Sequence, residues 1–431
     1  MSTQLFINLN WLLADKILRI IGGLVIGVWI ARFLGPEQFG VLSYASAFVA
    51  LFGTIAKINI DMVVVRDLTR TPDKEHAILG TVFTIKFFAS LISLILVFSF
   101  AWVTQDGNIE FVVLVMVIAA GMIFNVLDAY DIYYQAHVMS RHVVFAKGIS
   151  FLFFSAVRIA LILFKSSVVY FAAASTLEIA FGGLLLVWVF RGTKKAAPKW
   201  HYDRQIMISL LRDGWPLIVS SALIVIHMRI DQVMIGQMLS NAEVGIYSVA
   251  IRLSEAWLFV PQIIVQTVTP YFVRLRESNL VFYQIRLLQL YSIMFWLSVL
   301  VGVLTTFFGK FFVALLFGEQ YQNAYLPLVL TIWTGIFISQ TIARGIWMIG
   351  ENLQGYRLIN NLITVPMNIA LNWFLIPIYG VVGASIASLI SMGIGAWIIP
   401  FLFKPMRVSN KQMLLGINPK YLFTKTLIES T

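Results

Sequence analysis

Three observations on this 431-residue sequence predict an all-α, polytopic membrane protein. Hydrophobic residues make up 60% of the chain and charged residues only 12%, whereas a soluble domain carries about 25% charged residues. The mean hydropathy is +0.87. Twelve separate windows are long and apolar enough to cross a bilayer, which takes about 20 residues. A lipid-facing surface needs no charge, and this explains the composition.

The N-terminal segment has no basic region and no small-residue cleavage site, so the first span is expected to be retained rather than removed as a signal peptide. The expected spans are 12–34, 40–60, 78–102, 110–135, 143–164, 168–190, 214–238, 246–269, 287–308, 325–349, 358–377 and 380–403.

The loops between these windows predict the orientation. Of the 31 Lys and Arg residues, 21 fall in loops and ends on one side and three, Arg32, Lys165 and Lys310, on the other. Cytoplasmic loops carry the excess of basic residues, so both termini and the long central loop are expected in the cytoplasm. The net charge of +11 is therefore a topology signal rather than a sign of nucleic-acid binding.

Two halves are expected, because 191–213 is the only long polar connection. Leu34–Gly40 after span one resembles Leu239–Gly245 after span seven, which suggests two six-helix lobes related by a pseudo-twofold axis along the membrane normal. Within the connection, Tyr202–Arg212 is expected to form a short amphipathic surface helix. The expected parts are an N-terminal lobe at 1–190, a cytoplasmic basic linker at 191–213, a C-terminal lobe at 214–404 and a cytoplasmic basic tail at 405–431.

Charged residues lie inside the spans, and eleven of them are considered as site candidates. If each faced lipid at the bilayer centre, the total cost would be about 30 kcal/mol, against a typical net stability of about 5–15 kcal/mol. Most must therefore face protein or a water-filled cavity. The basic ones, candidates for substrate binding, are Arg229, Lys86, Arg158, Arg252, Lys147, Arg19 and Arg344. The acidic ones, candidates for ion coupling, are Asp231, Glu178, Glu255 and Asp128.

The position of each charge in its span leaves two interpretations open. Lys86, Arg158 and Arg229 lie deep, where they form either buried ion pairs or a cationic, hydrated cavity for an anionic headgroup. Lys and Arg suit the second role because they offer only donors, and guanidinium binds phosphate oxygens bidentately. Arg19, Lys147 and Arg344 lie near cytoplasmic span ends, from which they can also extend to lipid headgroups.

Span seven contains His227, Arg229 and Asp231 within five residues. At about 100° per residue, His227 and Asp231 lie about 40° apart on one helix face, while Arg229 lies about 160° from each. Either Arg229 faces the lumen and the other two face a neighbouring helix, or the reverse holds.

Enzymatic signatures are absent. The chain has no cysteine, no phosphate-binding G-x-x-x-x-G-K-[ST] loop, no G-x-S-x-G, no H-E-x-x-H and no metal-ligand spacing among its five histidines. Neither catalysis nor a cofactor or metal is expected. Transport would use an ion gradient, the membrane potential or the substrate gradient.

Short motifs at fixed places in this span order resemble a known family. They are the R-F-L-G-P-E-Q-F-G turn ending at Gly40, Asp231–Gly236 in span seven, Leu316–Tyr321 before span ten and the I-Y-G-V-V-G-A-S entry ending at Ser385. This pattern is similar to that of the Wzx-type lipid-linked oligosaccharide flippases, the polysaccharide transport branch of the multidrug/oligosaccharidyl-lipid/polysaccharide superfamily.

The resemblance implies a polyprenyl-diphosphate-linked oligosaccharide moved across the bacterial inner membrane for O-antigen, capsule or exopolysaccharide synthesis. It implies alternating access around a central cationic cavity, with H⁺ or Na⁺ as coupling ion. A monomer in the phospholipid membrane, working beside a polysaccharide polymerase, is expected. An ion-coupled multidrug exporter of the same superfamily is one alternative, although the seven basic candidates inside the spans outnumber the four acidic candidates. A membrane glycosyltransferase or polymerase is another, but no outer loop is long enough to hold a catalytic domain.

Overall fold

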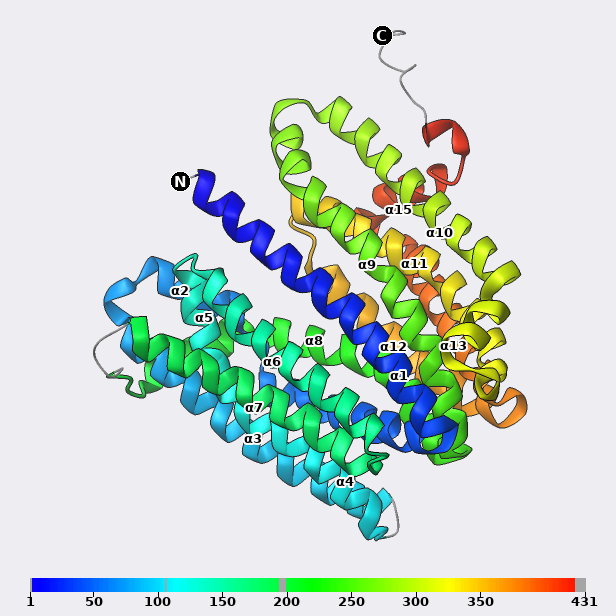
Figure 1. Cartoon of the computed structure of the whole chain (residues 1–431). Coiled ribbons are helices and arrows are strands. Elements are labelled where there is room, and N and C mark those ends of the chain that lie inside the picture. Colours follow the sequence, from blue (N-terminus) through cyan, green and yellow to red (C-terminus); the bar gives the residue numbers. More distant parts are fainter. Residues whose placement is uncertain (1, 105–106, 194–198, 423–431) are drawn as a thin grey trace. The chain divides into compact units, whose positions relative to one another are not determined.

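The computed structural model describes residues 2–104, 107–193 and 199–422, and within these ranges the chain is helical, with no strand (Figure 1). The predicted all-α polytopic fold is confirmed. Residues 194–198 of the predicted linker and 423–431 of the predicted tail lie outside the described residues. The α-helices are α1 Ser2–Lys57, α2 Asp61–Arg70, α3 Glu75–Thr104, α4 Ile109–Ala119, α5 Asp128–Ala136, α6 Ser140–Leu163, α7 Val168–Thr193, α8 Arg204–Met238, α9 Asn241–Ser278, α10 Leu280–Phe317, α11 Tyr325–Gly350, α12 Gly355–Tyr379, α13 Val381–Gly393, α14 Ile399–Leu402 and α15 Arg407–Leu415.

Shorter helical turns join several of these helices. They are η1 Pro72–Lys74, η2 Ala120–Leu127, η3 Glu319–Ala324, the π-helical η4 Ile394–Ile398, η5 Lys404–Met406 and η6 Pro419–Leu422.

Among the described residues, eleven helical stretches are long and apolar enough to cross a membrane. The first, Leu18–Arg70, overlaps both the first and the second predicted span, and each of the others overlaps one. The predicted loop between the first two spans is instead a kink within α1. Gly35 takes φ 72° and ψ 172°, a conformation that suits glycine, and Pro36 follows it without an N–H to donate.

The chain forms two compact units, Met1–Val233 and Met234–Thr431. The boundary falls inside α8, twenty residues beyond the start of the predicted C-terminal lobe at 214. Residues 204–212 are the first turns of α8, so the separate surface helix predicted at Tyr202–Arg212 is wrong.

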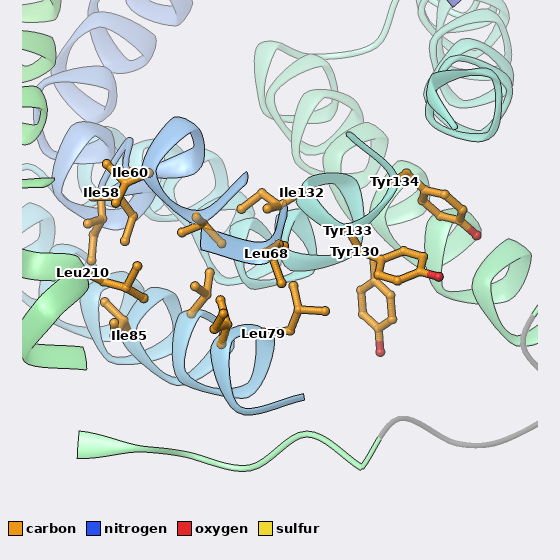
Figure 2. Close-up of a cluster of buried hydrophobic side chains, with 14 of the residues drawn as sticks. Ile58, Ile60, Leu68, Leu79, Ile85, Tyr130, Ile132, Tyr133, Tyr134 and Leu210 are labelled. Atoms are coloured by element: carbon orange, nitrogen blue, oxygen red, sulfur yellow. The ribbon is translucent and has the colours of Figure 1, made fainter. Parts of the chain in front are cut away.

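A buried cluster in the first unit packs around α2 and α5 (Figure 2). Ile60, Leu79 and Leu210 are fully buried in it, and Tyr134 at the end of α5 has no exposed surface. The chain enters α2 through a sharp turn in which Ile58 and Asn59 have φ of 56° and 40°. Asn59 Nδ2 donates a hydrogen bond to Ser221 Oγ of α8 at 3.1 Å. This turn places the N-terminus of α2 beside α3.

A second buried cluster lies in the other unit, around α10 and α11, and includes Met406 and Met413. The described part of the predicted tail, 405–422, therefore packs on this unit through α15. At the start of α13, a Cβ on Gly383 would collide with the backbone of Leu375 in α12. Gly383 thus permits close packing of α12 against α13.

Candidate functional site

Lys86 of α3 is 1% exposed, and its Nζ donates to Asp61 Oδ1 at 3.0 Å. Asp61 is the first residue of α2, and its side chain is 40% exposed. The turn at residues 58–59 brings the carboxylate to the ammonium. Lys86 is therefore a buried cation with a neutralising partner, as the ion-pair interpretation predicts. Asp61 lies just outside the predicted second span and was not among the predicted site residues.

Lys147 of α6 meets two carboxylates of α5. Its Nζ lies 2.5 Å from Asp131 Oδ2 and 3.8 Å from Asp128 Oδ1. Asp131 is only 13% exposed, whereas Lys147 and Asp128 are about one-third exposed. Asp128 and Asp131 lie three residues apart, so both project from the same face of α5 towards α6.

Arg19 of α1 lies over the ring of Phe151, with its guanidinium carbon 5.6 Å from the ring centre. It is also close enough to Lys147 to interact electrostatically. Asp128 in turn interacts with Lys86 and Asp61. These electrostatic interactions relate the two ion pairs, and Arg19, Asp61, Lys86, Asp128, Asp131 and Lys147 are here called the charge cluster. Three cations and three carboxylates balance its charge.

Arg158 of α6 and Glu178 of α7 form an ion pair, with Nη1 2.7 Å from Oε2. Their side chains are 12% and 19% exposed. Arg158 Nη2 also donates to Ser175 Oγ at 3.2 Å, and Ser175 lies one turn before Glu178 on α7. The residues predicted separately for substrate binding and for ion coupling are therefore direct partners.

The three ionisable residues of span seven differ in burial. His227 and Asp231 are buried, with exposures of 9% and 4%, while Arg229 is half-buried. Arg229 Nη1 donates to the side-chain oxygen of Gln232 at 3.4 Å. Among the described residues His227 Nε2 has no hydrogen-bond partner, and His227 interacts electrostatically with Asp231. The predicted shared face of His227 and Asp231 is thus the more buried one.

In the second unit, Arg344 of α11 is 3% exposed and does not extend to the headgroups. Its Nη2 donates to the carbonyl of Ala396 in η4 and, at 2.9 Å, to Asn410 Oδ1 in α15. Its Nε approaches the sulfur of Met413. Arg344 thereby ties α11 to η4 and α15.

Arg252 and Glu255 of α9 are half-buried and lie three residues apart. Their spacing puts both on one side of the helix. Glu255 and Arg252 therefore share a face of α9 in the second unit, whereas the charge cluster belongs entirely to the first.

No group of three or more His, Asp or Glu side chains in the described part of the chain is arranged to hold a metal ion. The residues that the sequence prediction missed are Asp61, Asp131 and Ser175. The position of a cation within its predicted span shows that it is buried, but it does not show which residue is its partner. The spacing of Asp128 and Asp131 was a local signal for Asp131; Asp61 and Ser175 required the packing of helices.

The family follows from a match between residues 6–276 and the polysaccharide biosynthesis protein family. That match covers more than half of the chain. The chain belongs to this family. This match confirms the family that the sequence motifs indicated.

A curated relative of this polysaccharide biosynthesis protein is the capsular polysaccharide biosynthesis protein CapF of Staphylococcus aureus. It is 24% identical over 403 residues, which span 89% of this chain and 95% of CapF. Among solved structures, the lipid II flippase MurJ in an inward closed conformation superposes with a TM-score of 0.70 and 14% identity, covering 97% of this chain and 92% of MurJ.

An inward-facing multidrug resistance MATE family transporter of the MOP superfamily gives a TM-score of 0.66 at 16% identity, covering 91% and 94% of the two chains. These identities show the fold alone. The polysaccharide biosynthesis protein is thus a multi-pass membrane protein with a fold that MurJ and MATE proteins also adopt.

Proposed function

We propose that this protein is a flippase that moves a polyprenyl-diphosphate-linked oligosaccharide from the cytoplasmic to the outer leaflet for surface polysaccharide synthesis. The observation that carries this proposal is the family match over residues 6–276. The fold supports it, since a protein described as a lipid II flippase has the same architecture. We place the protein in a bacterial inner membrane with both termini in the cytoplasm, and we propose alternating access without any chemical step on the substrate.

Arg229 is the first candidate for binding the diphosphate headgroup. A diphosphate carries acceptor oxygens only, and guanidinium donates to it bidentately. Arg229 is half-buried and therefore accessible, whereas Lys86 is 1% exposed and bound to Asp61. Arg229 therefore contacts the diphosphate directly. Lys147, about one-third exposed, is the second accessible cation, and the diphosphate can replace Asp131 as its partner.

The more buried cations have a supporting role in this proposal. Lys86 and Arg158 contact headgroup only after their ion pairs open, so they couple substrate binding to movement of α2 or α7. Arg252 and Arg344 lie in the second unit, where Arg344 is committed to protein acceptors. Arg19 contributes positive charge beside Lys147.

For ion coupling, Asp231 is the preferred residue. It is 4% exposed, one helical turn from His227, whose Nε2 has no hydrogen-bond partner among the described residues. A carboxylate one turn from an imidazole with a free ring nitrogen offers two groups able to carry a proton. Glu178, which pairs with Arg158, and the less buried Asp128 and Glu255 are the further coupling candidates. Protons are thus the proposed ion, ahead of Na⁺.

The test uses the full chain in proteoliposomes with a fluorescent polyprenyl-diphosphate-linked oligosaccharide in both leaflets. Dithionite quenches only the outer label, so a flippase raises the quenched fraction from one half towards completeness. A labelled phospholipid is the control substrate and is expected to stay at one half. Quenching of both lipids alike, or of neither while a cationic dye is exported, would overturn the proposal and favour a scramblase or a drug exporter.

Two variants separate the proposed roles. Arg229→Gln is expected to slow flipping of the labelled lipid at least tenfold, whereas Arg407→Gln, an exposed cation of α15, leaves the rate unchanged. Asp231→Asn is expected to abolish acceleration by an imposed proton gradient. Unchanged gradient dependence in Asp231→Asn would remove Asp231 from the coupling role.

A further inference from the structure

The second unit contains a cleft of about 610 Å³, and none of the residues proposed above for headgroup binding or ion coupling lines it. It lies where three connections gather: α8 to α9 near residue 240, α10 to α11 through η3, and α12 to α13 at Gly380. In Figure 1 the first of these is green and the last is orange. The volume is within the range of about 300–1,000 Å³ for small-ligand sites.

The cleft is lined by side chains of mixed chemistry. The polar and aromatic ones are Glu243, Lys310, Gln322, Asn323, Tyr325 and Tyr379. They present an ammonium, a carboxylate, two amides and two phenols, so donors and acceptors of hydrogen bonds are both plentiful. A lipid tail would leave these groups unsatisfied, and a simple anion would be repelled by Glu243. A ligand whose own groups both donate and accept matches the lining.

The two tyrosines add flat apolar surfaces. Tyr325 is fixed, because its hydroxyl donates to the carbonyl of Thr306 at 2.8 Å. Tyr379 is 55% exposed at the end of α12, beside Gly380, whose φ of 59° turns the chain into α13. Sugar rings have hydroxyls at their rims and C–H faces that pack on aromatic rings, and this combination is what the cleft offers.

We propose that this cleft is a sugar-binding subsite that takes the terminal sugars of the lipid-linked oligosaccharide on the outer side of the membrane. The proposal rests on the proposed function and on the predicted orientation, which places Lys310 outside. Tyr379 stacks on a sugar ring, Asn323 and Gln322 bind its hydroxyls, and Lys310 and Glu243 select the polar substituents. Sugar recognition is thereby separated from diphosphate recognition, because no lining residue belongs to the cations proposed for the headgroup.

The experiment measures binding of a free sugar to the full chain in lipid nanodiscs. The probe is the oligosaccharide released by mild acid from the host's own surface polysaccharide, which has neither lipid nor diphosphate. Saturation-transfer difference NMR or calorimetry gives the affinity. Tyr379→Ala and Asn323→Ala are expected to weaken binding at least tenfold. Tyr271→Ala, a tyrosine of α9 with 42% exposure that does not line the cleft, is expected to stay within twofold.

Binding and transport together decide which proposal fails. Flipping of the labelled lipid without any binding of the free oligosaccharide, or with equal binding by all three variants, overturns the subsite and leaves the flippase intact. Sugar binding that Tyr379→Ala weakens, in a protein that moves no lipid-linked oligosaccharide, overturns the flippase and keeps the cleft as a sugar site.

Discussion

Removal of one partner of the Arg158–Glu178 ion pair is expected to destabilise the first unit strongly. The Nη1 and Oε2 atoms are 2.7 Å apart, which corresponds to an attraction of about 6 kcal/mol at an effective dielectric constant of 20. Desolvation of both groups offsets much of this attraction in the intact pair. A single substitution removes the attraction but leaves the other charge buried.

The expected loss is about 3 kcal/mol for Arg158→Met or for Glu178→Gln. A broken buried ion pair costs about 3–5 kcal/mol. The lower value applies here because the side chains of Arg158 and Glu178 are still 12% and 19% exposed to solvent. In Arg158→Met, Glu178 keeps its charge; in Glu178→Gln, Arg158 still has Ser175 as an acceptor. The double variant leaves no buried charge and is expected within about 1–2 kcal/mol of the unsubstituted protein.

The assay is unfolding by sodium dodecyl sulfate in dodecyl maltoside micelles, which yields a free energy for each variant of the double-mutant cycle. Glu110→Gln, an exposed carboxylate at the start of α4, controls for charge removal. A coupling energy below about 0.5 kcal/mol, with the double variant as unstable as the sum of the two single variants, would refute the ion-pair reasoning.

Three further predictions use the same unfolding assay. Lys147→Met is expected to cost about 2 kcal/mol, a value reduced for its partial exposure, and Asp131→Asn in the same chain should restore most of it; no loss would contradict the contact. Gly383→Ala is expected to lower the free energy of unfolding by about 1–3 kcal/mol, because the added Cβ would clash with α12. Gly345→Ala, which has open space around it, is expected to raise the free energy of unfolding by about 0.5–1 kcal/mol. Equal effects of the two substitutions would refute the close packing at Gly383. Arg344→Ala is expected to cost about 2–4 kcal/mol and Arg344→Lys nearly as much, because an ammonium cannot serve acceptors on η4 and α15 together; full recovery in Arg344→Lys would contradict this.

Much of the fold was predictable because hydropathy acts locally. A window of about 20 apolar residues has to become a helix in a bilayer, since only a helix satisfies its own backbone groups. Every long apolar helical stretch among the described residues overlaps a span that this reasoning predicted. It failed at Gly35, where it expected a loop instead of a kink, and at Tyr202–Arg212, where residues 204–212 are the first turns of the long helix α8. In both places the helix continues through polar residues that mark a loop in a hydropathy profile.

The candidate site was only partly predictable. The cost of charge in lipid predicted that Lys86, Lys147 and Arg158 have partners or water around them, and each has a carboxylate within 3.0 Å. Which carboxylate it is depends on helices that meet from distant parts of the chain. Part of the cleft lining falls in sequence motifs, with Glu243 in Leu239–Gly245 and Tyr379 in the I-Y-G-V-V-G-A-S entry, but only the packing shows that these separate connections meet.

The sequence by itself determined that this chain crosses a membrane many times as helices, that its in-span charges need compensation and that it resembles polysaccharide transporters. Only the tertiary structure decided that Lys86 binds Asp61, that Arg158 binds Glu178 and that Arg344 is held by backbone and amide oxygens. The physical reason is the range of the interactions. Partitioning into lipid is a property of each segment in turn, whereas an ion pair exists only when packing brings two side chains within about 4 Å.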